Sequence, residues 1–145
     1  MSKLKLFAAA VLLGVFCTPI WAADDADTGT DDQQQQPLAT YHEAMNYLLG
    51  RNGRPKSAEK AAELFQSLAE KNWSSAQRML GHMYYEGKGV EQNNLLAYKW
   101  LSLAVRNNSR LAEEYSSRRR QLQSQIPASS LKEVDKWIAE WQPES

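Results

Sequence analysis

The sequence has little of what several classes of protein require. One cysteine among 145 residues cannot form an intramolecular disulfide, and two histidines leave few ligands for a zinc site. The 17 basic and 17 acidic residues give no formal net charge, so the basic excess that is typical of nucleic-acid-binding proteins is absent. We therefore expect no nucleic acid among the partners, and the length suits one small domain.

Signatures of catalysis are also missing. No Gly-x-Ser-x-Gly segment occurs, and the Gly-Lys-Gly at residues 87–89 has neither the spacing of a P-loop nor a strand before it. His42 and His82 have no cysteine or carboxylate at the spacing of zinc ligands, so we interpret both as surface residues. We expect a protein that is not an enzyme, with no catalytic residue, no bound metal and no cofactor.

The sequence begins with a segment of the kind that directs export. Two lysines precede an eleven-residue apolar run at residues 6–16, and small residues follow at Ala22 and Ala23. This order is typical of a signal peptide, and the run is shorter than the roughly 20 residues of a membrane-spanning helix. We expect residues 1–22 to be removed after Ala22. Ile20 is acceptable three residues before that cut, whereas a cut one residue later would place a tryptophan there.

Cys17 leaves lipidation as an alternative. A lipobox has a leucine-like residue three positions before its cysteine and a small residue directly before it, and Gly14 and Phe16 stand there instead. Cleavage after Ala22 removes Cys17 and two of the 17 basic residues, and the remaining 15 basic against 17 acidic residues give a net charge of −2. We expect an exported protein, periplasmic or alternatively secreted, with no stable membrane anchor after cleavage.

Residues 23–37 differ in composition from the rest of the chain. Five aspartates precede four consecutive glutamines, and no large apolar or aromatic residue interrupts them. Such a segment buries too little apolar surface to offset the entropy that ordering would cost. We expect a disordered, acidic and glutamine-rich tether.

From residue 38 onward the apolar residues recur at helical spacing. Five of them would share one helix face: Ala61, Ala62, Phe65, Leu68 and Ala69. Capping residues indicate further helix starts. Ser74 with Gln77 forms a capping-box pattern, Ser130 with Glu133 forms another, and Asn93 or the asparagine after it can cap a helix between them. Alternating strand patterns are rare, so we predict an all-α domain.

An internal repeat organises these helices. A shift of 35 residues places Phe65 on Trp100 and Asn72 on Asn107, and a shift of 36 aligns the glycines at positions 53 and 89. A helix–turn–helix unit of about 35 residues that occurs twice is typical of an α-solenoid.

The second unit carries a specific motif with Asn93 at the start of its second helix. Ten other residues stand at fixed spacing: Ala76, Leu80, Gly81, Tyr84, Gly87, Gly89, Val90, Ala97, Trp100 and Ala104. The pattern resembles the Sel-one-like repeat, a relative of the tetratricopeptide repeat, which usually has aspartate in place of Asn93. The ten residues have structural roles: small side chains let helices approach, the last two glycines supply positive φ, and the aromatic rings and Val90 fill the hairpin.

The resemblance implies a short right-handed α-α superhelix, or solenoid, over residues 38–142. Its units are 40–72, where the motif is degenerate, and 76–107. Two closing helices, of the kind found in exported bacterial relatives, are expected at about 109–125 and 130–142. An apolar stripe supports the last of them: Val134, Trp137, Ile138 and Trp141. The resemblance also implies a role in protein–protein interaction, as an adaptor or regulator.

The face of the repeat that points away from the hairpin core is the candidate binding surface, because solenoids bind partners along such faces. Five positions point outward on the helix that begins near Ser74: Ser75, Arg78, His82, Tyr85 and Glu86. Arginine and tyrosine are favoured at interfaces, so Arg78 and Tyr85 are the leading contacts for another protein or peptide. We expect alanine at both positions to change stability by no more than about 0.5 kcal/mol.

The basic run Arg118–Arg120 supports a second hypothesis. Glu114 lies four residues before the run, a spacing that pairs charges along a solvated helix face. The same run would alternatively hold a cell-envelope polymer or a small ligand, and such binding would weaken steeply with salt. Both interpretations stay open.

Overall fold

The computed structural model describes residues 31–143 and, within them, all side chains except those of residues 31–34, 109, 112 and 113. The helices in this range are α1 (Asp31–Leu49), α2 (Ala58–Glu70), α3 (Ser74–Glu86), α4 (Asn94–Asn107), α5 (Ser109–Gln125) and α6 (Ala128–Glu140). No strand occurs in residues 31–143, and the prediction of an all-α domain is confirmed. The predicted signal peptide, 1–22, and residues 23–30 of the predicted tether lie outside the described residues.

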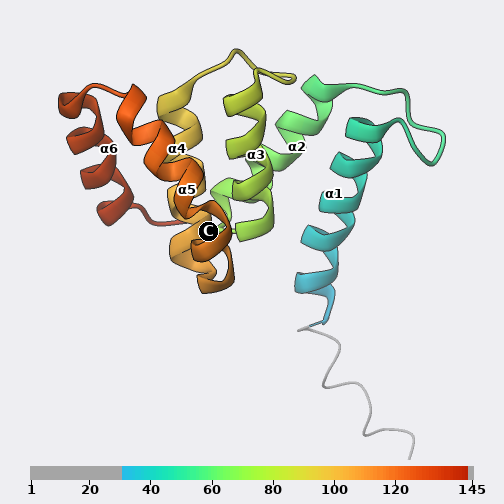
Figure 1. The fold of residues 1–145 in the computed structure, drawn as a ribbon. Coiled ribbons are helices and arrows are strands. Elements are labelled where there is room, and N and C mark those ends of the chain that lie inside the picture. Colours follow the sequence, from blue (N-terminus) through green and yellow to red (C-terminus); the bar gives the residue numbers. More distant parts are fainter. Residues whose placement is uncertain (1–30, 144–145) are drawn as a thin grey trace, which may run out of the picture.

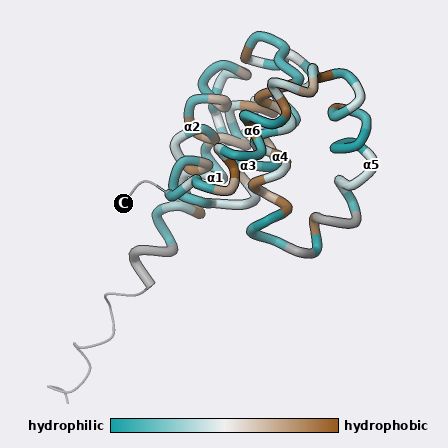
Figure 2. Tube along the Cα trace, turned by 90° about the vertical axis from the view of Figure 1, so that its left-hand side faces the viewer, coloured by the Kyte–Doolittle hydropathy of each residue, from teal (hydrophilic) through white to brown (hydrophobic). Residues whose placement is uncertain are grey.

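The helices succeed one another as an open row of hairpins, from α1 at the right of Figure 1 to α6 at the left. Each helix from α1 to α4 packs on the next, and α4 also contacts both α5 and α6. Polar and apolar positions alternate along the helices, as Figure 2 shows, so each helix turns one side to its neighbours. None of the helices within the described range is both long and apolar enough to cross a membrane.

The first helix begins earlier than the composition suggests. Residues 31–37 are helical, so the prediction of a disordered tether is wrong for this part of 23–37. Glutamine has a high helix propensity, and aspartate is favourable near the N-terminus of a helix. Pro37 lies inside α1 and costs one backbone hydrogen bond. Composition predicted disorder because these residues lack apolar side chains, but they extend a helix whose later turns pack against α2.

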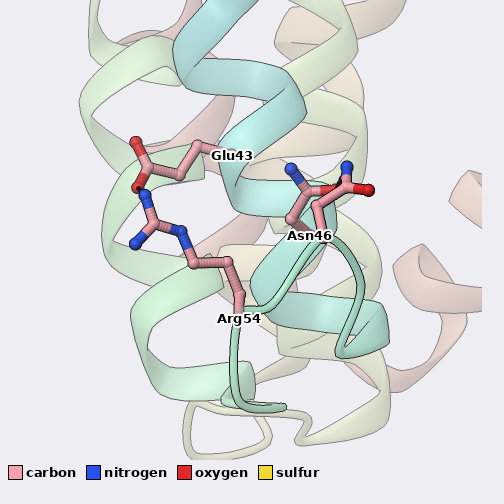
Figure 3. A network of polar contacts seen from close by, with 4 residues as sticks. Glu43, Asn46 and Arg54 are labelled. Carbon is pink, nitrogen blue, oxygen red and sulfur yellow. Dashed lines mark hydrogen bonds and ion pairs between the residues drawn. The ribbon is translucent and has the colours of Figure 1, made fainter.

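Two polar contacts order the turn between α1 and α2 (Figure 3). Arg54 Nη2 forms an ion pair with Glu43 Oε1 at 2.9 Å, and Asn52 Nδ2 donates to Asn46 Oδ1 at 3.0 Å. Both acceptors belong to α1, so the turn is tied back to the helix that precedes it. The side chains are exposed, and each contact therefore stabilises the turn only modestly.

The core lies between the helices of the hairpins. All five residues predicted for the inner face of α2 are buried: Ala61, Ala62, Phe65, Leu68 and Ala69. The motif residues of α3 and α4 that face each other are buried as well: Ala76, Leu80, Gly81, Ala97, Trp100 and Ala104. Tyr84 and Val90 are half-buried and pack at the edge of this core.

Glycines of the motif lie where two parts of the chain come close together. A Cβ atom on Gly81 would lie 2.8 Å from Leu101 Cγ. Because glycine has no Cβ, α3 and α4 can approach each other closely here. A Cβ atom on Gly89 would lie 2.3 Å from the carbonyl carbon of Ala58 at the start of α2. Gly87 ends α3 in the left-handed conformation, with φ of 66°. The turn of the second repeat is therefore packed directly on the first repeat.

Both predicted capping boxes are wrong. The residue before α3 is Trp73, which makes no side-chain cap, so Ser74 does not act as the N-cap. Helix α6 begins at Ala128, two residues before Ser130, and Pro127 stands at its N-cap without a side-chain cap. Asn93, in contrast, does cap α4, because its Oδ1 accepts a hydrogen bond from the backbone N–H of Leu96 at 3.0 Å.

Gln77 connects the two repeats instead of capping α3. Its side chain is fully buried, and Nε2 donates to Ala69 O at 3.0 Å and to Asn72 Oδ1 at 3.3 Å. Its Oε1 accepts from Asn107 Nδ2 at 3.0 Å, and the same Nδ2 also donates to Asn72. The C-terminal carbonyls of a helix need partners, and Gln77 supplies one to α2. The asparagines that the 35-residue shift aligned are thus in direct contact.

Aromatic rings hold α6 on α4. The ring of Trp137 lies edge-on to Trp100, with 6.4 Å between centroids, and Trp141 lies 6.2 Å from Trp137. Lys99 Nζ lies 3.4 Å from the centroid of Trp137, and burial lowers the pKa of this lysine. A cation over an indole ring is a favourable contact, and aromatic rings bury large apolar areas.

Candidate interaction surface

Three of the outward residues of α3, namely Arg78, His82 and Tyr85, contact side chains of α5. Arg78 Nη1 donates to Tyr115 Oη at 3.3 Å, and the His82 ring lies edge-on to the Tyr115 ring with 5.1 Å between centroids. Tyr115 itself is only 6% exposed. The expectation of an open α3 face is therefore wrong, because α5 folds back and covers part of it.

Arg118 of α5 contacts the other candidates. Its Nη1 lies 3.1 Å from His82 Nδ1, and its guanidinium carbon lies 4.7 Å from the centroid of the Tyr85 ring. Arg78, His82 and Tyr85 are half-buried, whereas Glu86 is exposed. Alanine at both Arg78 and Tyr85 would remove contacts to α5, so we now expect a cost above the roughly 0.5 kcal/mol of a surface change.

Tyr41 extends the same surface to α1. It lies close enough to Arg78 to interact with its charge, and its ring packs edge-on against Phe65 with 5.4 Å between centroids. Three odd-numbered helices thus contribute to one surface. We call it the odd-helix face: Tyr41, Arg78, His82, Tyr85, Tyr115 and Arg118.

The sequence prediction missed Tyr41 and Tyr115 as members of this face. A signal for Tyr115 is present, since buried or half-buried apolar residues recur at helical spacing along α5 and at its C-cap: Leu111, Tyr115, Leu122 and Ile126. That spacing identifies the inner side of α5. It does not identify α3 as the helix on which part of that side rests.

The two arginines of the odd-helix face form no ion pair with the carboxylates that the structure describes. The ion pairs among the described side chains lie elsewhere, in the α1–α2 turn and within α6. Neither Arg78 nor Arg118 lies within ion-pair distance of a described carboxylate. Glu86 and Glu114 act on the face only through their charge. The odd-helix face is therefore locally positive, although the chain as a whole has no formal net charge.

This positive charge acts on His82. Burial lowers the pKa of His82 below the usual value for histidine, and the charges of Arg118 and Arg78 lower it further. Glu86 and Glu114 raise it by smaller amounts. Arginine can only donate, so the contact between Arg118 and His82 Nδ1 requires a neutral ring with Nδ1 unprotonated.

We expect His82 to make the protein less stable as the pH falls below about 6.5, the usual histidine pKa in an unfolded chain. The folded state holds the lower pKa, so the unfolded chain takes up this proton first and is favoured. Urea unfolding across pH would show this loss in the wild type and in His42→Asn, but a smaller loss in His82→Asn. An unchanged pH dependence in His82→Asn would contradict the expectation.

The basic run does not form one exposed patch. Arg118 points to His82 and Tyr85. Arg119 lies over the Tyr98 ring at 5.9 Å, and its Nε is buried with no hydrogen-bond partner among the described residues. Arg120 is exposed, and its Nε donates to a backbone carbonyl of its own helix. Consecutive helix residues point in different directions, so nothing in the geometry favours the polymer-binding hypothesis.

A shallow groove between α1 and α2 is a separate feature of the surface. Its lining residues are Glu43, Tyr47, Lys60, Glu63 and Leu64. Arg54 and Lys60 lie over the Tyr47 ring, at 5.5 and 5.3 Å from its centroid. The groove therefore holds both signs of charge close together, and it includes none of the residues that the sequence indicated.

Stacked helical hairpins with a shared outer face define an α-solenoid repeat protein. The family model of the Sel1 repeat matches residues 37–73 and 74–109, which together make up half of the chain. The chain belongs to the Sel1 repeat family, and the resemblance seen in the sequence is confirmed. Sel1 repeat proteins are generally non-enzymatic scaffolds of protein–protein interaction.

Among the solved structures that share this fold are two helical-repeat proteins. One is c5321, a protective antigen of uropathogenic Escherichia coli strains with an SLR fold. It is 25% identical, with a TM-score of 0.63 over 74% of this chain and 22% of that chain. A Sel1 repeat protein from Oxalobacter formigenes is 31% identical, with a TM-score of 0.51 over 59% of this chain and 35% of that one. This chain thus spans about a fifth and a third of their lengths. No curated protein matches it.

Proposed function

We propose that this protein is an exported adaptor or regulator that binds another protein or peptide on its odd-helix face. The observation that carries the proposal is the composition of that face. Arg78 and Tyr85 of α3 lie with Tyr41 of α1 and Arg118 of α5 on one surface, and arginine and tyrosine are enriched at binding hot spots.

The way these side chains are held supports the proposal further. Arg118 lies over Tyr85, and Arg78 is bonded to Tyr115, so both arginines are ordered before any partner arrives. Ordered side chains lose less conformational entropy when a complex forms. A short solenoid offers a small surface, and a pre-ordered one binds more tightly than a mobile one of the same area.

The test is capture of a partner from envelope extract at low and high salt. The wild-type chain is compared with the double variant Arg78→Ala/Tyr85→Ala. The control is a double alanine variant on the exposed side of α2, Gln66→Ala/Ser67→Ala. We expect a protein that the wild type and the α2 control retain at high salt and that the α3 variant loses. Circular dichroism shows whether the α3 variant keeps its helices.

Retention of the same proteins by the wild type and the folded α3 variant would contradict a role for the odd-helix face. Retention only at low salt, unchanged in the α3 variant, would contradict the adaptor function. It would favour binding through charge alone, since a tyrosine-containing interface loses much less affinity with salt.

Export is the second part of the proposal, and its support is the order of charged, apolar and small residues in 1–22. A large residue at the cleavage position blocks signal peptidase, so Ala22→Leu should accumulate the precursor. Ala23→Leu, one residue beyond the cut, should still be cleaved. Intact mass of the chain from the periplasm distinguishes the two. Normal processing of Ala22→Leu would contradict cleavage after Ala22.

A further inference from the structure

Arg78 and Arg118 are half-buried cations that lack a described carboxylate partner. Removing a guanidinium from water is unfavourable unless an anion or several acceptors compensate it. Here the compensation consists of one phenol, one imidazole and one aromatic ring. These groups are uncharged, so they do not neutralise the positive charge of either arginine.

Both arginines keep donors that are not bonded to any of the described side chains. A guanidinium has five N–H groups in a planar fork. In Arg78 one of them is bonded to Tyr115 Oη, and in Arg118 one is directed at His82 Nδ1. Arg118 is also held over the Tyr85 ring, which fixes the position of its fork. Such a fork matches the two oxygens of a carboxylate.

The guanidinium groups of Arg78 and Arg118 both lie near His82. His82 contacts Arg118 directly, and its pKa is lowered by the charges of both Arg118 and Arg78, so the two cations act on the same place. Among the described side chains, the acidic groups near His82 are Glu86 on α3 and Glu114 on α5, and their influence is weaker. A ligand at this position therefore meets positive potential with partly desolvated donors.

From this arrangement we infer that Arg78, Arg118 and His82 form a carboxylate-binding site, and that the partner is recognised through an acidic peptide segment. The inference rests on the proposed function and names the chemistry of its partner. Carboxylate side chains of the segment bind the two guanidinium groups. Tyr41 and Tyr85, on the same face, contact its apolar atoms.

The test uses two fluorescein-labelled peptides made of alanine, tyrosine and either glutamate or glutamine at the same positions. Fluorescence anisotropy measures their binding to the chain from Ala23 onward. We expect the glutamate peptide to bind at least tenfold more tightly than the glutamine peptide. Arg78→Gln and Arg118→Gln should each weaken it about tenfold, which corresponds to the loss of one charge-assisted contact.

Arg120→Gln is the matched control, because it removes the same charge from an exposed position of α5. Arg118→Lys is a second variant that keeps the charge and the contact with α3 but lacks the fork, and it should still lose most of the affinity. Thermal unfolding of each variant shows that the fold is intact.

The pKa of His82 gives a readout that loss of packing would not mimic. A bound carboxylate offsets the arginine charges, so the glutamate peptide should raise the pKa of His82 in an NMR titration, and the glutamine peptide should leave it unchanged. His82→Asn assigns the signal, since His42 is the other histidine of the chain.

Equal binding of the two peptides would overturn the inference and leave the proposed function standing. An equal loss in Arg120→Gln would overturn it as well, since any charge would then suffice. Binding that appears only after Asp24, Asp25 and Asp27 are replaced by asparagine would assign the site to this chain's own acidic segment and overturn the role of a partner. Selective binding of the glutamate peptide, with no protein retained from extract, would support the site and contradict the adaptor function.

Discussion

Replacing Gly89 by alanine should destabilise the protein by about 3 kcal/mol, the sum of two unfavourable effects. The backbone has φ of 71°, which costs an alanine about 1 kcal/mol. The new Cβ would also lie 2.3 Å from the carbonyl carbon and oxygen of Ala58. Those atoms belong to the backbone at the start of α2, so they cannot turn away as a flexible side chain would, and the whole turn must move.

Gly53 is the matched control, because the repeat aligns it with Gly89. Its φ is 73°, and a Cβ there meets no atom within 4 Å. Gly53→Ala should therefore cost only the backbone term of about 1 kcal/mol. Urea unfolding followed by circular dichroism measures both variants. Equal losses would show that the close contact between the second turn and α2 does not contribute to stability.

Replacing Trp137 by alanine should cost about 3 kcal/mol and release α6 from α4. The variant loses the contacts to Trp100 and Trp141, and Lys99 loses the ring over which its ammonium lies. The expected cost is at the low end for a tryptophan because the side chain is half-buried. Amide hydrogen exchange should then show faster exchange throughout α6, with α2 and α3 little changed.

Lys136→Ala is the control on the same helix. Its side chain is exposed, and its ion pair with Glu140 spans 4.0 Å, so the change should stay within about 0.5 kcal/mol. If α6 kept its protection in Trp137→Ala, the aromatic contacts would not be responsible for holding it. The candidates would then be the apolar contacts of Ile138 and the hydrogen bonds that Arg106 and Tyr98 of α4 donate to Ile138 O and Asp135.

Local patterns were sufficient to predict much of the fold. The spacing of five residues in α2 identified its buried face, because a helix that packs on one neighbour shows its apolar side directly in its period. The alignment of Asn72 with Asn107 identified residues that proved to be in contact. The prediction of Ser74 as a cap is wrong because the partner of Gln77 is the end of α2, and a capping pattern does not show competing acceptors.

The candidate site could be predicted only in part. Helical period placed Arg78, His82 and Tyr85 on the side away from the hairpin core, and they do lie there. The period of α3 holds no information on which later helix reaches that side. Contacts such as Arg78 with Tyr115 join positions 37 residues apart in the sequence.

The sequence by itself determined the helices, their repeat and the family, since these depend on residues that interact within one helix or one hairpin. Only the tertiary structure decided that α5 covers part of the outer face of α3 and that the side chain of Arg118 points away from those of Arg119 and Arg120. It also decided that the charges of Arg78 and Arg118 both act on His82. The physical reason is that burial and charge of a side chain depend on every helix that packs around it. Such packing is set by the stacking of hairpins rather than by the period of any one of them.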